Sequence, residues 1–193
     1  ARRGVSLPFT DFCPALLTTP AAGAALWESA KALARERRWR YVELRSAGAV
    51  PAGTRPSLEF FGHVLDLRPG VQALQSQLDP SVRRALRKSQ AAGLRVEIAG
   101  DAAAIEAYYR LHCLTRQGHG LPPQPFRFFE NIARHILSSE QGIVVIARHE
   151  GRPVAAAVFM HFAAHAIYKF GASDRAAQHL RPNNLVMWEG IRY

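Results

Sequence analysis

Hydrophobic and polar positions alternate with a period of two in two short stretches of the first hundred residues, and a third stretch has the residue types of a strand. Residues 39–45 and 94–100 alternate apolar with polar or charged side chains, and residues 58–67 are rich in aromatic and aliphatic ones. A period of two sends successive side chains to opposite sides of a strand. The pattern predicts strands over these three ranges, with a loop rich in Gly and Pro at residues 46–57.

A period of three to four residues indicates helices elsewhere. Residues 23–38 show it, and their cations gather at the C-terminal end, where the helix dipole favours positive charge. A second helical pattern, residues 71–92, is interrupted at Asp79-Pro80. Because Asp is a good N-cap and Pro is tolerated in a first turn, the sequence predicts two helices here. We expect Asp101 to cap the next helix.

The second half of the chain continues with an amphipathic helix at residues 126–139. Three consecutive antiparallel strands follow, with turns at residues 149–152 and 163–165. A last helix begins at Pro182 or Asn183. This order predicts an α/β fold with an antiparallel meander in its middle.

Composition excludes several classes of protein. Of the 193 residues 48% are hydrophobic and 21% are charged, which excludes a disordered tail. No apolar run approaches the roughly 18 residues of a spanning helix, so we expect no transmembrane segment. The two cysteines, Cys13 and Cys113, lie far apart, so they predict neither a disulfide framework nor a CxxC site, and they favour a reducing compartment.

The net charge is +10, and all 25 cations but three lysines are arginines. Arg suits phosphate and carboxylate ligands, which favours an anionic partner; a GC-rich genome is the alternative source of the bias. Arg84, Arg87 and Lys88 fall on one face of the helix predicted to begin at Pro80. We predict that this face binds phosphate groups, the alternative being a solvated helix surface.

Two segments, residues 82–99 and 168–193, resemble the GNAT-like acyltransferase superfamily, most closely its FemAB-like and BioF2-like members. Residues 7–13 are similar to a segment of exopolysaccharide-associated members. The resemblance implies an α/β fold with a GNAT-like mixed, largely antiparallel sheet flanked by helices. It also implies that residues 1–75 are the C-terminal part of a first GNAT-like half, that residues 76–193 are most of a second, and that the chain is truncated at both ends.

The resemblance also bears on the donor substrate. GNAT enzymes that use acyl-CoA carry a glycine-rich loop whose N–H groups hold the pyrophosphate. Here Arg181 and Asn183 stand at the expected glycines, and Pro182 lacks an N–H. This departure is compatible with FemAB-like members, which take aminoacyl groups from aminoacyl-tRNA. Acyl-CoA and aminoacyl-tRNA are therefore both expected donors, with no tightly bound cofactor.

The resembling strand, loop and helix supply the candidate catalytic residues, because acyl transfer needs a base and groups that hold the oxyanion. They are Tyr168, Lys169, Asp174 and Glu189. We expect Tyr168 and Lys169 to point to opposite faces of their strand. The alternative for Asp174 is a role in the turn, and for Glu189 a surface charge.

The same segment supplies the candidate substrate-binding residues beside the basic helix face. They are Gly171, Ser173, Asn183 and Asn184, with Arg84, Arg87 and Lys88 for the phosphates. Backbone groups from Gly171 to Ser173 and the start of the last helix are expected to orient the acyl group. The alternative reading of Asn183 and Asn184 is that they cap this helix.

No metal site is predicted. His161 and His165 have a spacing that would suit a helix, but we place them on strands across a turn, without a third ligand. His112 and His119 lie near Cys113, yet adjacent residues of one helix point apart. These side chains are predicted to be structural.

The sequence thus leads to two functional hypotheses. The first is an acyltransferase or aminoacyltransferase that acts on an amine or hydroxyl of a cell-envelope or exopolysaccharide precursor. The second is a non-catalytic RNA-binding module that uses the Arg-rich face. The expected partners are a phosphate-bearing substrate, tRNA and, peripherally, a membrane. The expected location is cytoplasmic, including the inner face of the membrane.

Overall fold

The structure is a computed structural model that describes residues 2–10, 12–45, 50 and 53–193. The chain divides into two compact units, unit 1 (Ala1–His63) and unit 2 (Val64–Tyr193). Of the predicted loop at residues 46–57, residues 46–49, 51 and 52 lie outside the described residues.

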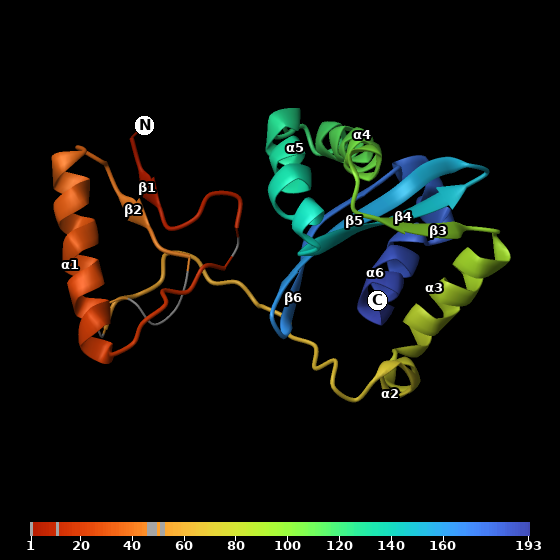
Figure 1. Ribbon diagram of the computed structural model, residues 1–193, viewed down its shortest axis with the longest axis horizontal. Coiled ribbons are helices and arrows are strands. Elements are labelled where there is room, and N and C mark those ends of the chain that lie inside the picture. The colour runs from red at the N-terminus through yellow and green to blue at the C-terminus, as the bar shows by residue number, and fades with distance from the viewer. Residues whose placement is uncertain (1, 11, 46–49, 51–52) are drawn as a thin grey trace. The chain divides into compact units, whose positions relative to one another are not determined.

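Unit 1 contains one long helix and a two-stranded parallel sheet (Figure 1). Its elements are β1 (Gly4–Val5), α1 (Pro20–Glu36) and β2 (Val42–Glu43). The hydroxyl of Thr19 caps α1 by accepting from the Ala22 N–H at 3.2 Å. Because β2 covers only Val42 and Glu43, the strand predicted at residues 39–45 is confirmed only over these two residues.

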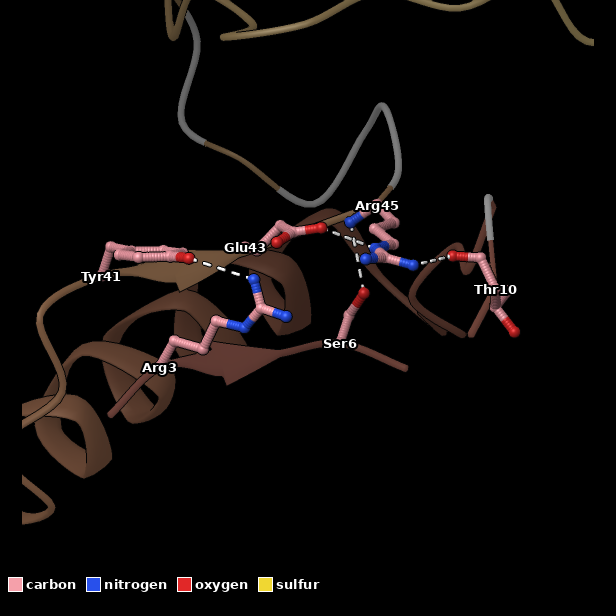
Figure 2. Close-up of polar contacts among 6 residues, drawn as sticks. All are labelled: Arg3, Ser6, Thr10, Tyr41, Glu43 and Arg45. Atoms are coloured by element: carbon pink, nitrogen blue, oxygen red, sulfur yellow. Dashed lines mark hydrogen bonds and ion pairs between the residues drawn. The ribbon is translucent and has the colours of Figure 1, made fainter. Parts of the chain in front are cut away.

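Polar contacts hold the segment after β1 against the segment around β2 (Figure 2). The Arg45 guanidinium donates to Glu43 Oε1 at 2.6 Å and also to the Thr10 carbonyl, while the Arg45 N–H donates to Ser6 Oγ at 3.2 Å. Arg3 donates to the Tyr41 hydroxyl at 3.2 Å. Hydrogen bonds and ion pairs therefore carry much of the local order in unit 1.

The predicted strand at residues 58–67 is wrong. No strand is assigned there, and Phe60, Phe61 and Val64 are exposed. A strand needs a neighbour to pair its N–H and C=O groups. The described chain offers none to this segment, so its aromatic and aliphatic residues do not become part of a sheet.

Unit 2 is built on a four-stranded antiparallel sheet in the order β3-β4-β5-β6. The strands are β3 (Arg95–Ala99), β4 (Gly142–His149), β5 (Arg152–Phe162) and β6 (His165–Ser173). The three consecutive strands predicted from the sequence are confirmed. The turn between β4 and β5 has positive φ at Glu150 and Gly151, as a two-residue hairpin turn requires.

Helices cover both faces of this sheet (Figure 1). They are α2 (Val71–Gln77), α3 (Pro80–Ala91), α4 (Ala102–Gly118), α5 (Phe126–His135) and α6 (Pro182–Arg192), with short 3-10 turns η1 (Leu137–Ser139) and η2 (Arg175–Leu180). One core joins α4 and α5 to one face of the sheet, and a second joins α3 and α6 to the other.

Two of the predicted helix starts are confirmed by their caps. The Asp79 carboxylate accepts from the Ser81 N–H at 2.7 Å, and α3 begins at Pro80. The Asp101 carboxylate accepts from the Ala104 N–H at 2.8 Å and caps α4.

The start of α6 differs from one prediction. Its N-cap is Arg181, in the left-handed region with φ 63°, and no side chain caps the helix. Asn183 and Asn184 therefore lie inside the first turn, so the prediction that they are N-caps is wrong. Pro182 fixes the first helical position, which places the cap one residue before it.

Candidate functional site

Ser173, at the end of β6, is held by two elements that are distant in sequence. Its N–H donates to Thr115 Oγ1 at 3.1 Å, and the Thr115 hydroxyl donates to the Ser173 carbonyl at 3.2 Å. Its own Oγ accepts from Asn183 Nδ2 at 3.2 Å. The structure thus brings two predicted site residues, Ser173 and Asn183, together with Thr115 of α4.

The outer edge of β6 carries backbone groups that no strand pairs among the described residues, because β6 has β5 as its one neighbour there. The Asp174 N–H donates to the Val154 carbonyl at 2.9 Å, so the next pair, Ser173 with Ala155, points its backbone groups outward. The alternation then directs the N–H and C=O of Gly171 outward as well.

The Tyr168 side chain lies over Gly171. Its ring packs edge-on against Phe159, with the ring centroids 5.5 Å apart, and a Cβ at Gly171 would collide with the Tyr168 hydroxyl. Glycine is therefore required for this close approach. Desolvation raises the pKa of Tyr168 above its ordinary value of 10.0, although 46% of the residue stays exposed. The hydroxyl is protonated at neutral pH and can donate a hydrogen bond.

Lys169 contacts the other layer. The pairing of β5 with β6 shifts between Val158 and Phe159, which leaves Lys169 as the extra residue of a bulge. Its Nζ lies 5.5 Å from the centroid of the Phe170 ring, in the core that contains α4 and α5. Tyr168 and Lys169 therefore contact opposite layers of unit 2.

The two predicted carboxylates both have local partners. Asp174 caps η2 by accepting from the Ala176 N–H at 2.9 Å. Glu189, on α6, forms an ion pair with Arg192 at 2.9 Å, with its side chain 19% exposed. Asn184 is half-buried in the first turn of α6. Asp174 follows Ser173 directly, whereas no described contact joins Glu189 to the Tyr168–Gly171 pair.

The predicted basic face lies on α3. The side chains of Arg84, Arg87 and Lys88 are exposed, and the ion pairs of the described residues include none of them. Arg83, which is half-buried, donates to the Ser76 carbonyl at 3.3 Å. Three cations therefore face solvent together on one helix, in the arrangement that the sequence predicts.

Two surface cavities of unit 2 have volumes of about 310 and 350 Å³. The first lies by the β5–β6 turn and the second by the β4–β5 turn, and no predicted site residue lines either. Among the residues that the structure describes, no cluster of His, Cys, Asp or Glu could hold a metal ion. His161 and His165 lie on β5 and β6, as predicted.

None of the helices in the described part of the chain has both the length and the apolar character that crossing a bilayer requires.

Thr115 was missed by sequence reasoning. A threonine in the last turn of a helix carries no signal of its own, and its partner is 58 residues away in the chain.

Unit 2 has a mixed α/β fold in which an antiparallel sheet lies between helices. Its candidate site lies at the edge strand β6, next to the start of α6. Residues 76–193 match the family described as the Acetyltransferase (GNAT) domain. The chain therefore belongs to the GNAT acetyltransferase family, and the predicted fold class is confirmed.

The crystal structure of FemX is similar, with a TM-score of 0.66 and 12% identity, covering 91% of this chain and 65% of that one. This chain thus spans slightly less than two thirds of FemX. A second similar structure is the C-terminal DUF2156 domain of a protein described as a lysylphosphatidylglycerol synthetase from Agrobacterium fabrum. Its TM-score is 0.39 with 16% identity, over 58% of this chain and 41% of that one. No curated protein matches the chain.

Proposed function

We propose that this GNAT-family acyltransferase moves an acyl or aminoacyl group to an amine or hydroxyl of a cell-envelope or exopolysaccharide precursor. The observation that carries the proposal is the edge of β6 at Gly171. Its N–H and C=O point outward, and the protonated Tyr168 hydroxyl lies directly over it. Two donors near one point suit a carbonyl oxygen that becomes negatively charged during transfer.

In the proposed reaction the acceptor amine or hydroxyl attacks the donor carbonyl carbon directly. The new C–N or C–O bond forms as the bond to the CoA sulfur or to the tRNA ribose oxygen breaks. The proton lost by the acceptor ends on that leaving atom. The Gly171 N–H binds the carbonyl oxygen, and Tyr168, with its raised pKa, donates to the oxyanion or the leaving atom.

Asp174 and Glu189 are the proposed proton acceptors, and Lys169 is proposed to bind negative charge near the opposite layer. Asp174 has the stronger support because it follows Ser173 directly, although its carboxylate also caps η2. Ser173, Asn183 and Asn184 are proposed to fix the start of α6 against the bound acyl group.

The donor is proposed to be acyl-CoA or aminoacyl-tRNA, and both bring phosphates. Arg84, Arg87 and Lys88 are proposed to bind them, because three exposed cations on one helix face attract a polyanion. The structural likeness to FemX supports the fold behind this proposal. A cytoplasmic location, with peripheral contact to the inner membrane face, fits a basic protein acting on envelope precursors.

The test is transfer from radiolabelled acetyl-CoA and, separately, radiolabelled aminoacyl-tRNA to an amino-bearing envelope precursor. We expect transfer from one donor, and a loss of about 100-fold in kcat for Tyr168→Phe. The exposed Tyr193→Phe variant is the matched control and keeps full activity. If the protein transfers from neither donor and shows salt-dependent RNA binding that needs Arg84 and Arg87, the acyltransferase hypothesis is rejected in favour of the RNA-binding module.

A further inference from the structure

The Thr115 side chain closes the outer edge of β6 at Ser173. A single hydroxyl accepts from the Ser173 N–H and donates to the Ser173 carbonyl, at 3.1 and 3.2 Å. These are the two groups that a further strand or an extended ligand would use at that residue. Ser173 is thereby removed from the open edge, while Gly171, two residues earlier, stays available.

The contact also fixes the position of the strand end. Thr115 is half-buried on α4, whose neighbouring residues Leu111 and His112 are buried in the core of unit 2. The Ser173 side chain in turn accepts from Asn183 in the first turn of α6. A hydroxyl on a packed helix is therefore linked, through Ser173, to the first turn of α6.

We infer that Thr115 is a positioning residue that closes the edge of β6 at Ser173 and leaves Gly171 as the first open position, where the donor carbonyl binds. The inference rests on the proposed function for the identity of that ligand. The closed edge itself rests on the two hydrogen bonds alone. Thr115 contacts no reacting atom, so its effect on transfer is exerted through Ser173 and Gly171.

The experiment uses the full chain with Thr115→Val, which keeps the shape of the side chain and removes the hydroxyl, and Thr115→Ser as the matched control. Amide hydrogen exchange, followed by NMR on the 15N-labelled protein, reports on Ser173 and Gly171 separately. We expect the Ser173 amide to be protected in the wild type and in Thr115→Ser, and to exchange at least tenfold faster in Thr115→Val. In the wild type, binding of the active donor slows exchange at Gly171.

Transfer activity supplies the second readout, at a temperature where circular dichroism shows every variant fully folded. We expect kcat to fall about tenfold in Thr115→Val, as for the loss of about 1.4 kcal/mol, and to recover in Thr115→Ser. Equal Ser173 exchange in all three proteins would overturn the inference. So would a Thr115→Val variant with a fast Ser173 amide and full activity. If the wild type transfers from neither donor, the proposed function fails, while the exchange of Ser173 still decides whether Thr115 closes the edge.

Discussion

Unit 1 and unit 2 each contain a helix with a side-chain N-cap, but the two units differ in how much hydrophobic surface their helices bury. Thr19 caps α1 and Asp101 caps α4, each through a backbone N–H three residues on. Yet the buried hydrophobic side chains that the structure describes all lie in unit 2, whereas unit 1 leaves Leu16 97% exposed and Phe12 64% exposed. In the described part of unit 1, the buried residues are Gly4 and Gly23.

The difference shows that local signals and a core are separate requirements. A cap and a helical period determine where a helix starts, but most helical stability in proteins comes from packing an apolar face. Unit 2 packs both faces of its sheet, and its candidate site lies on an edge fixed by those layers. Unit 1 relies on polar contacts such as Arg45 with Glu43.

The comparison is tested most strongly by truncating one large side chain in each unit. Phe129 is fully buried among the rings of α4 and β6, so Phe129→Ala should lower the free energy of unfolding by about 3–5 kcal/mol. Leu33, on α1, is 40% exposed, so Leu33→Ala should change it by less than about 0.5 kcal/mol. Urea titrations followed by far-UV circular dichroism measure both.

Trp188 is buried in unit 2 and provides an independent probe once Trp27 and Trp39 are replaced by Phe. In that background, the Trp188 fluorescence transition should move with Phe129→Ala and stay in place with Leu33→Ala. A loss from Leu33→Ala as large as that from Phe129→Ala would show that unit 1 has a core of its own, contrary to the comparison.

A pair of glycines gives a sharper contrast at smaller energies. In α6 the Gly→Ala change by itself favours the helix by about 1 kcal/mol, but a Cβ at Gly190 would collide with the Phe159 ring. Overpacking costs about 1–3 kcal/mol and wins, so Gly190→Ala should destabilise unit 2 by about 1 kcal/mol. Gly62, in unit 1, has no atom within 4 Å of such a Cβ, and Gly62→Ala should be neutral within about 0.5 kcal/mol.

The Gly190 result can be checked with a double mutant. Replacing Phe159 by Leu gives the new methyl group room, so Gly190→Ala should become neutral or stabilising in the Phe159→Leu background. Thermal unfolding of the four proteins of this cycle supplies the comparison. If Gly190→Ala stabilises the wild-type chain outright, the Phe159 ring is free to move and the close packing of α6 on β5 is weaker than described.

The same contrast explains how much of the fold the sequence could predict. In unit 2, strong local signals coincide with a core, so the break at Asp79-Pro80, the cap at Asp101 and the three consecutive strands are confirmed. Residues 58–67 are rich in the aromatic and aliphatic residues typical of a strand, yet the prediction fails there. Residue types indicate which side chains could be buried, but not whether a partner strand exists.

The candidate site was predictable only in part, for a similar reason. Asn183 and Ser173 lie ten residues apart within one strand–loop–helix, so a motif can bring them to attention together. Thr115 meets Ser173 across 58 residues, through the packing of α4 on the sheet. The bulge that displaces Lys169 depends on the register of β5 with β6, and no single strand's sequence specifies it.

The smallest expected effect concerns histidine and acts only in acid. The His112 ring is buried between the Tyr108 hydroxyl, 3.3 Å from Nδ1, and Gln124 Oε1, 2.6 Å from Nε2. Burial lowers the pKa of His112 below its ordinary 6.5, with Arg116 adding to the effect and the Gln124 bond opposing it.

As the pH falls, the unfolded chain therefore binds a proton at this histidine at a higher pH than the folded chain does. The free energy of unfolding should therefore be independent of this group above about pH 6.5 and fall as the pH drops below it. In His112→Asn the difference in unfolding free energy between pH 7.5 and pH 5.0 should shrink, whereas Phe129→Leu, which destabilises the same core without removing a titrating group, should keep the wild-type difference. An unchanged pH dependence in His112→Asn would mean that the ring has the same pKa in the folded and unfolded chains, so that the Gln124 bond offsets the effect of burial.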